Sequence, residues 1–161
     1  MINLLSFYGT ITMISDIGQN TESDGCYKLI SVVDSSGAQV NFVVSPTTYF
    51  VDHVMVRIGD EITGYYDGNA PAPLIFPPQY QALIMVKESM DQNVKVDFFN
   101  NMLVSSDGLV EINLSATTQI VLQNGQAFSG NLANRLLIVI YGASTKSIHA
   151  QTIPYKIIVL C

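Results

Sequence analysis

The stretch Tyr65–Val86, which reads YYDGNAPAPLIFPPQYQALIMV, recurs later in the chain in weakened form. When it is moved forward by 75 positions (141 − 66 and 155 − 80), Tyr66 falls on Tyr141 and Tyr80 falls on Tyr155. An internal repeat at a fixed spacing constrains the fold strongly, because both copies must form one supersecondary structure. The repeat therefore predicts a duplicated unit, but it does not say what the protein does.

The first copy predicts a strand, a tight turn, a loop and a second strand. Glu61–Tyr66 alternates as a strand does, and Asp67–Asn69 is a turn because Gly and Asn tolerate positive φ. The four prolines that follow cannot donate to a strand ladder, so this segment should lie outside any central strand. Gln79–Val86 then returns as an apolar strand.

The rest of the chain shows short strands and Gly/Pro turns but no convincing amphipathic helix. The further strands expected are Phe7–Ile14, Cys26–Asp34 and Ala38–Ser45 in the first copy, and Val94–Phe99, Asn100–Val104, Val110–Ser115, Ile138–Tyr141 and Pro154–Leu160 in the second. Asp16–Gly25 is expected to be a loop, and Tyr49–Val56 a short strand or a helical turn. This pattern predicts an all-β chain of two tandem OB-like small β-barrels, over residues 1–89 and 90–161.

Composition favours a folded protein with an interface. Hydrophobic residues make up 48% of the 161 positions and charged residues only 12%, which is too apolar for disorder. So few charges indicate that part of the surface is covered by a protein partner or by self-association into an oligomer. The net charge of −6 and the total of seven Lys and Arg argue against nucleic acid and against an anionic membrane surface.

Cysteine usage and the first residues bear on location. Two cysteines, Cys26 and Cys161, are too few for a disulfide scaffold, and two thiols in a reducing compartment are the simpler interpretation. The start of the chain has no basic segment followed by a long apolar run, so we expect a cytoplasmic protein. A secreted protein from which a leader has been removed is left open.

No catalytic or metal-binding residues are expected. Asp60 and Asp67 are explained by turn chemistry, and a Ser45–Thr48 segment of hydroxyls is better explained by bonds to nearby backbone at a strand end. The two histidines, His53 and His149, lack the close spacing of a zinc ligand set. We therefore expect no enzyme and no cofactor.

Aromatic residues give one candidate binding site. Tyr65, Tyr66, Phe76 and Tyr80 could line an aromatic face of the kind on which OB barrels bind sugars and single strands. The competing interpretation is that they are core or barrel-closing residues. Because the chain is acidic, a neutral, carbohydrate-like ligand or a protein is favoured over nucleic acid.

The same region resembles a known module. Gly59-Asp60 before a strand, a Pro77-Pro78-Gln79 loop and Ala82 in an apolar strand are similar to an uncharacterised tandem β-barrel module of Gram-positive bacteria. The second copy departs from this pattern, since it has Asn134-Arg135 near the Gly-Asp position. The resemblance implies a fold and no activity. Together these features predict a non-enzymatic binding or assembly module, with a neutral ligand and, less favoured, single-stranded nucleic acid as alternatives.

Overall fold

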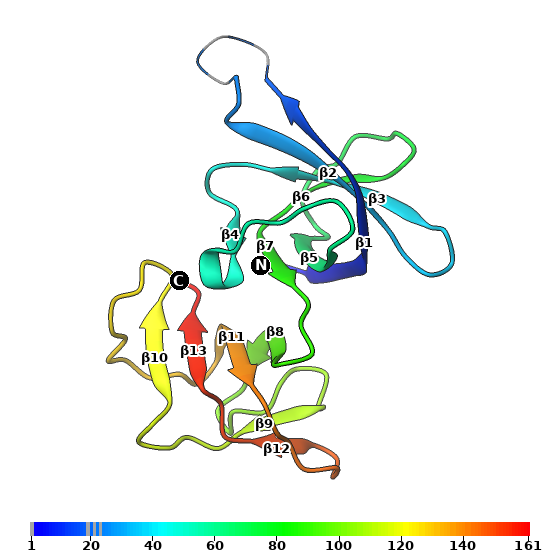
Figure 1. Cartoon of the computed structure of the whole chain (residues 1–161). Coiled ribbons are helices and arrows are strands. Elements are labelled where there is room, and N and C mark those ends of the chain that lie inside the picture. Colours follow the sequence, from blue (N-terminus) through cyan, green and yellow to red (C-terminus); the bar gives the residue numbers. More distant parts are fainter. Residues whose placement is uncertain (1, 19, 21, 23) are drawn as a thin grey trace. The chain divides into compact units, whose positions relative to one another are not determined.

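A computed structural model of the protein describes residues 2–18, 20, 22 and 24–161 (Figure 1). The prediction of an all-β chain is confirmed, because thirteen strands and one short 3₁₀ turn account for the regular structure of the described residues. The chain divides into two compact units, Met1–Glu88 and Ser89–Cys161, which are described separately below. Within the described part, no helix is long and apolar enough to cross a bilayer.

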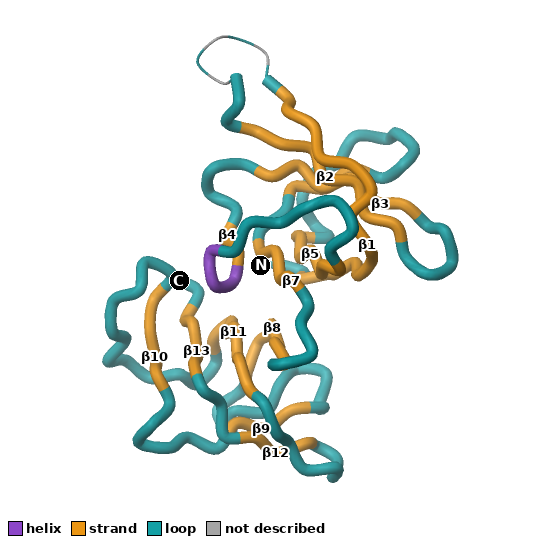
Figure 2. Tube along the Cα trace, viewed as in Figure 1, coloured by secondary structure: helices purple, strands orange, loops and turns teal. Residues whose placement is uncertain are grey.

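Unit 1 contains seven strands and the 3₁₀ turn. They are β1 (Leu4–Ile17), β2 (Tyr27–Val33), β3 (Gln39–Val44), β4 (Tyr49–Phe50), the turn η1 (Val51–His53), β5 (Glu61–Asp67), β6 (Gln79–Gln81) and β7 (Ile84–Lys87) (Figures 1 and 2). Both expectations for residues 49–56 are met, since a two-residue strand precedes a helical turn. The expected loop over residues 16–25 is shorter, because Asp16 and Ile17 belong to β1. Three residues of this expected loop, Gln19, Thr21 and Ser23, lie outside the described residues.

Strand β1 pairs with two partners along its length. Its first half is antiparallel to β5 and its second half is antiparallel to β2, with a bulge between Ile11 and Met13. At the change of partner, a Cβ on Gly9 would lie 2.5 Å from the carbonyl oxygen of Val33, so only glycine fits there. The bulge and the glycine let one long strand bend across both neighbours.

The segment formed by β6 and β7 joins the two sides of unit 1. Strand β6 is parallel to β3, and β7 is antiparallel to β5 and parallel to β4. Between them, the Ala82 N–H donates to the Val43 carbonyl at 3.0 Å and the Leu83 N–H donates to the Tyr65 carbonyl at 2.8 Å. The pairing therefore runs from β1 through β2, β3, β6–β7 and β5 back to β1.

The core of unit 1 is centred on Phe42. Its ring is fully buried and packs with Ile11, Ile62 and Met85, which come from three different strands. A Cβ on Gly64 would lie 2.5 Å from this ring, so the absence of a side chain at Gly64 makes the space for it. Burying a side chain of this size stabilises the fold by about 3 kcal/mol.

Unit 2 contains six strands. They are β8 (Asn93–Phe99), β9 (Val110–Ile112), β10 (Gln119–Leu122), β11 (Arg135–Tyr141), β12 (Ala150–Thr152) and β13 (Lys156–Val159). They form a sheet of order β10-β13-β11-β8 and a separate β12-β9 pair. Antiparallel β8–β11 and β11–β13 match β1–β5 and β5–β7 of unit 1, and parallel β10–β13 and β9–β12 match β4–β7 and β3–β6.

A hydroxyl motif follows β3 in unit 1 and β9 in unit 2. The Thr48 hydroxyl accepts from the Ser45 N–H at 3.0 Å and donates to the carbonyl of Ala82, two residues before β7, at 2.8 Å. In unit 2, the Thr118 hydroxyl accepts from the Ser115 N–H at 3.4 Å and donates at 2.8 Å to the carbonyl two residues before β13. The expectation that the hydroxyls of Ser45–Thr48 bond backbone at a strand end is confirmed. In both units the threonine hydroxyl also bonds a carbonyl just before the last strand.

The expected strand Asn100–Val104 is wrong. The Asn100 side chain accepts hydrogen bonds from the N–H groups of Met102 and Val104, and Leu103 has a positive φ of 59°. A short amide side chain that bonds its own backbone in this way replaces a strand ladder with a turn. Two isolated bridges, Phe99–Ser105 and Val104–Glu111, take the place of the strand.

The expected match of Tyr80 with Tyr155 is also wrong. Phe42 and Ile112 are equivalent, since each lies three residues before the serine of the hydroxyl motif. Tyr80 lies opposite Phe42 in the β3–β6 pair, whereas Thr152 lies opposite Ile112 in the β9–β12 pair. Thr152 therefore has the place that Tyr80 has in unit 1. The reason is that the loop before this strand is shorter in unit 2, so the constant spacing ends at Tyr141.

Candidate functional site

The loop of residues 68–78, between β5 and β6, exposes three consecutive large apolar side chains. Leu74 is fully exposed, Phe76 is 90% exposed and Ile75 is 54% exposed. Figure 2 shows this segment as loop, as predicted for the proline-rich part of the chain. Residues 68–81 contain no charged side chain. We call residues 68–78 the apolar loop.

The ends of the apolar loop are fixed by hydrogen bonds. The Asp67 carboxylate accepts from the N–H groups of Asn69 at 2.9 Å and Asn3 at 3.0 Å. These two backbone donors hold the pKa of Asp67 below its usual value. At the other end, the Asn41 N–H donates to the Pro78 carbonyl at 2.9 Å. The four prolines of the loop, the last of which is the anchor Pro78, fix φ at their positions, so the exposed side chains are carried on a restricted backbone.

The structure brings together two of the four predicted aromatic residues. The rings of Tyr66 and Tyr80 are stacked, with centroids 3.9 Å apart and planes 6° apart. Tyr66 also lies against the Phe42 ring at 6.1 Å. Burial, and then the neighbouring Tyr80, raise the pKa of the Tyr66 hydroxyl. This pair covers the edge of the core, as the core interpretation of the aromatics expects.

The other two aromatics lie elsewhere. Gly64 and Tyr66 both lie against Phe42, and Tyr65 stands between them in β5. Because neighbouring residues of a strand point to opposite faces, Tyr65 points away from Phe42. Phe76 is at the exposed part of the apolar loop. The four residues therefore do not form one aromatic platform.

A small cavity lies at the base of the apolar loop. Its volume is about 50 Å³, and it opens to solvent between the loop and the β6–β7 segment. It is lined by Asp67, Ala70, Pro71, Ala72, Tyr80, Gln81 and Leu83. Small-molecule sites usually have volumes of about 300–1,000 Å³, so this cavity is too small for a sugar ring.

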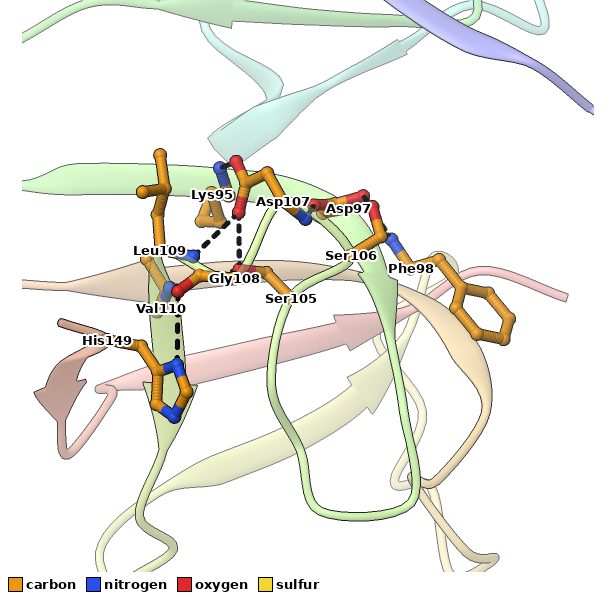
Figure 3. A network of polar contacts seen from close by, with 10 residues as sticks. All are labelled: Lys95, Asp97, Phe98, Ser105, Ser106, Asp107, Gly108, Leu109, Val110 and His149. Atoms are coloured by element: carbon orange, nitrogen blue, oxygen red, sulfur yellow. Dashed lines mark hydrogen bonds and ion pairs between the residues drawn. The ribbon is translucent and has the colours of Figure 1, made fainter.

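The densest polar network of unit 2 surrounds the turn before β9 (Figure 3). The Asp107 carboxylate accepts from Lys95, from the Ser105 hydroxyl at 2.6 Å and from the Leu109 N–H at 3.0 Å. Burial raises the pKa of Asp107, but the hydrogen bonds from Lys95, Ser105 and Leu109 outweigh it, and the net shift is downward.

The neighbouring carboxylate is used in the same way. Asp97 accepts from the Ser106 hydroxyl at 2.5 Å, from the Phe98 N–H at 2.7 Å and from the Asp107 N–H at 3.3 Å. Both carboxylates therefore hold the turn in place, which is a structural role. Lys95 is too distant in sequence from Asp107 for their ion pair to be predicted from the sequence of the turn.

The remaining candidates for chemistry also have structural partners. Asp60 accepts from the Arg57 N–H at 2.8 Å, as expected of a turn residue. The Nδ1 atom of His149 lies 3.1 Å from the Gly108 carbonyl (Figure 3). Among the residues that the structure describes, no three His, Cys, Asp or Glu side chains are grouped to hold a metal ion. Cys26 and Cys161 are both free and exposed.

Comparison of the chain with protein-family models, curated proteins and solved structures finds no match. The resemblance to a Gram-positive module and the cytoplasmic location therefore stay predictions. Within the chain itself, the feature that sequence reasoning missed is the exposure of Leu74 and Ile75. The available signal was an apolar run enclosed by prolines, which cannot enter a strand ladder.

Proposed function

We propose that the protein is a non-enzymatic binding module, built from two OB-like barrels, that contacts another protein through the apolar loop of unit 1. The observation that carries this proposal is the exposure of Leu74 and Phe76 on a proline-restricted, uncharged loop. Three consecutive exposed apolar residues are unfavourable in a surface loop unless they serve a contact.

The order of strands in unit 1 supports an OB-like barrel. An OB-fold is a five-stranded, partly open barrel, and the β1-β2-β3-(β6–β7)-β5 circuit has five strands when β6 and β7 are counted as one segment. The apolar loop then joins the fourth and fifth strands in chain order. In OB-folds this connection is one of the two loops that commonly contact ligands.

Core packing supports the proposed duplication. Phe42 and Gly64 of unit 1 have Ile112 and Val139 in the corresponding places of unit 2, and all but the glycine belong to the buried cores. In unit 1 a large side chain, Phe42, lies against a glycine, whereas unit 2 has two side chains of intermediate size, Ile112 and Val139. Such a volume-conserving exchange is what two diverged copies of one core require.

The energetics also favour a protein contact. Fully burying each of Leu74, Ile75 and Phe76 would contribute about 2 kcal/mol. Four prolines in the loop lower the entropy that is lost when it binds. The free energy gained by burying these three side chains is comparable to that of the few residues that dominate binding in a protein interface.

The alternatives have less support. The cavity beside Tyr80, of about 50 Å³, is small for a carbohydrate, and the Tyr66 and Tyr80 rings cover each other. Single-stranded nucleic acid would need basic residues along its path, and the chain carries a net charge of −6. A role without catalysis agrees with the structural partners of Asp60, Asp97 and Asp107, each of which accepts from the backbone of a turn.

Site-specific photocrosslinking tests the proposed function. A photoreactive phenylalanine analogue is placed at Phe76 in cells that produce the protein, and the same analogue is placed at Ile148 as a control. Ile148 is 93% exposed and lies in the loop before β12, among polar neighbours. We expect discrete crosslinked protein bands from position 76 only. Equal labelling at both positions, or none, would contradict the proposal.

A further inference from the structure

We propose that the protein bound by the apolar loop is a second copy of this chain, with Leu74 of each copy in the cavity of the other. This inference rests on the proposed function. It is drawn from two features of unit 1 that lie within the same loop: a protruding apolar side chain and an apolar cavity beside it.

The cavity has a suitable size for the Leu74 side chain. A site needs roughly 10–15 Å³ to admit a single water-sized group, so a volume of about 50 Å³ admits more than one such group. The leucine side chain has four carbon atoms, whereas the benzyl group of Phe76 has seven. Ala72 and Leu83 offer apolar contacts in the wall of the cavity.

The arrangement is self-complementary. In a two-fold symmetric dimer, each residue that contacts a partner residue is contacted by it in return. Pro71 and Ala72 line the cavity, and Leu74 follows only two residues later. A protrusion and a cavity this close together can be exchanged between two copies about one two-fold axis, which closes the assembly at two.

The charges near the cavity permit this contact. Among the described residues that line the cavity, Asp67 alone is charged, and its carboxylate already accepts two backbone hydrogen bonds within its own chain. Burying it therefore does not leave a carboxylate without partners. The interface is limited mainly to one loop from each copy, which is small for a stable dimer, so the dissociation constant should lie between about 10 μM and 1 mM.

Sedimentation equilibrium over that concentration range tests the inference. The wild-type chain should show a reversible increase from monomer to dimer mass. Leu74→Asp and the cavity-filling Ala72→Leu should each weaken the association at least tenfold, whereas Ile148→Asp should leave it unchanged. Circular dichroism and thermal unfolding verify that all the variants fold.

Four results would overturn the inference: a wild-type monomer at about 1 mM, an equal effect of Ile148→Asp, growth of the mass beyond a dimer, or flotation of a monomer with phosphatidylcholine vesicles. The proposed function is judged separately. If photocrosslinking at position 76 captures a different protein while the chain stays monomeric, the second copy is excluded but the protein-binding loop stands.

Discussion

The two units share four strand pairings, but among the described residues no strand of unit 2 corresponds to β2 of unit 1. They also differ in the loop before β6 and before β12, the strands that pair with β3 and β9. In unit 1 this loop presents Leu74, Ile75 and Phe76 without any charged neighbour. In unit 2 the corresponding loop is shorter and polar, and it exposes one large apolar residue, Ile148, near Lys146. Scattered exposed apolar residues are ordinary, but contiguous ones are not. Strand pairings common to both units form with either loop, so they do not require apolar residues there. The exposed apolar residues of unit 1 therefore need a separate explanation.

The cores differ at one pair of equivalent positions. The ring of Phe42 occupies the space left by Gly64, whereas unit 2 has Ile112 and Val139 there, both in its buried core. Exchanging these residues tests whether the two cores are equivalent.

The largest effect is expected from Gly64→Val, which introduces the residue that unit 2 has at this place. Its Cβ would lie 2.5 Å from the Phe42 ring, so the free energy of unfolding should fall by about 3 kcal/mol. Phe42→Ile alone should cost about 2 kcal/mol because it leaves a cavity. Denaturant unfolding of both variants measures these losses.

The double variant sharpens the test. Gly64→Val with Phe42→Ile reproduces the unit 2 pair, so it should cost at least about 1.5 kcal/mol less than the sum of the two single changes. Simple additivity would mean that the two positions do not compensate, and the proposed duplication would lose its core-packing support.

The hydroxyl motif should show equal effects in the two units. Thr48→Val and Thr118→Val each remove one donor and one acceptor at the junction with the last strand. Each should lower the free energy of unfolding by about 2 kcal/mol, because a backbone N–H and a carbonyl lose their partner. A large loss at only one of the two positions would show that the motif has different roles in the two units.

The stabilities contributed by the turn before β3 and the turn before β9 should depend differently on salt. Asp107 pairs with Lys95, whereas Asp34 is held by the Ser36 hydroxyl and by backbone N–H groups. Asp107→Asn should cost about 1 kcal/mol, and part of that loss should disappear at high salt. The effect of Asp34→Asn should not depend on salt. Thermal unfolding at two salt concentrations compares them.

The pH dependence of these turns follows from their lowered pKa values. The hydrogen bond from Ser36 lowers the pKa of Asp34, and bonds from Lys95 and Ser105 lower that of Asp107 against the effect of burial. A carboxyl with a lowered folded-state pKa stabilises the fold above its unfolded value, near about 3.9, and this stability is lost as pH falls through the folded value. Wild type and Asp107→Asn should therefore converge in stability below about pH 4. A constant difference down to acidic pH would refute this assignment.

The smallest effect is expected at the apolar loop. Leu74→Asp and Phe76→Ser should change the free energy of unfolding by less than about 0.5 kcal/mol, since both side chains are exposed. Denaturant unfolding measures this. A loss above about 1 kcal/mol would mean that these residues pack within unit 1 and are not kept for an external contact.

Much of the architecture could be predicted from the sequence. Alternating apolar residues and turn glycines predicted the all-β class, and the prolines placed residues 71–78 outside the strands. The separation of Tyr65 from Tyr66 was also predictable, because neighbouring residues of a strand point to opposite faces. What failed was the assumption of one constant spacing, which put Tyr155 where the strand register puts Thr152.

Other features depend on side-chain geometry that the sequence does not specify. Asn100 could have continued a strand, but its side chain bonds the N–H groups of Met102 and Val104 and stabilises a turn. Likewise, the run Leu74–Phe76 has the composition of a buried segment. Its exposure follows from where the chain is anchored, at Asp67 and Pro78, and not from local preference.

Native-state hydrogen exchange of individual amides shows whether unit 1 carries an exposed apolar loop on a ring of paired strands. The Ala82 and Leu83 amides, bonded to the Val43 and Tyr65 carbonyls, should exchange only on global unfolding of unit 1. The amides of Leu74, Ile75 and Phe76 should exchange at least about a thousandfold faster in the monomer. Slow exchange at these three positions in dilute solution, or fast exchange at Ala82 and Leu83, would contradict the account.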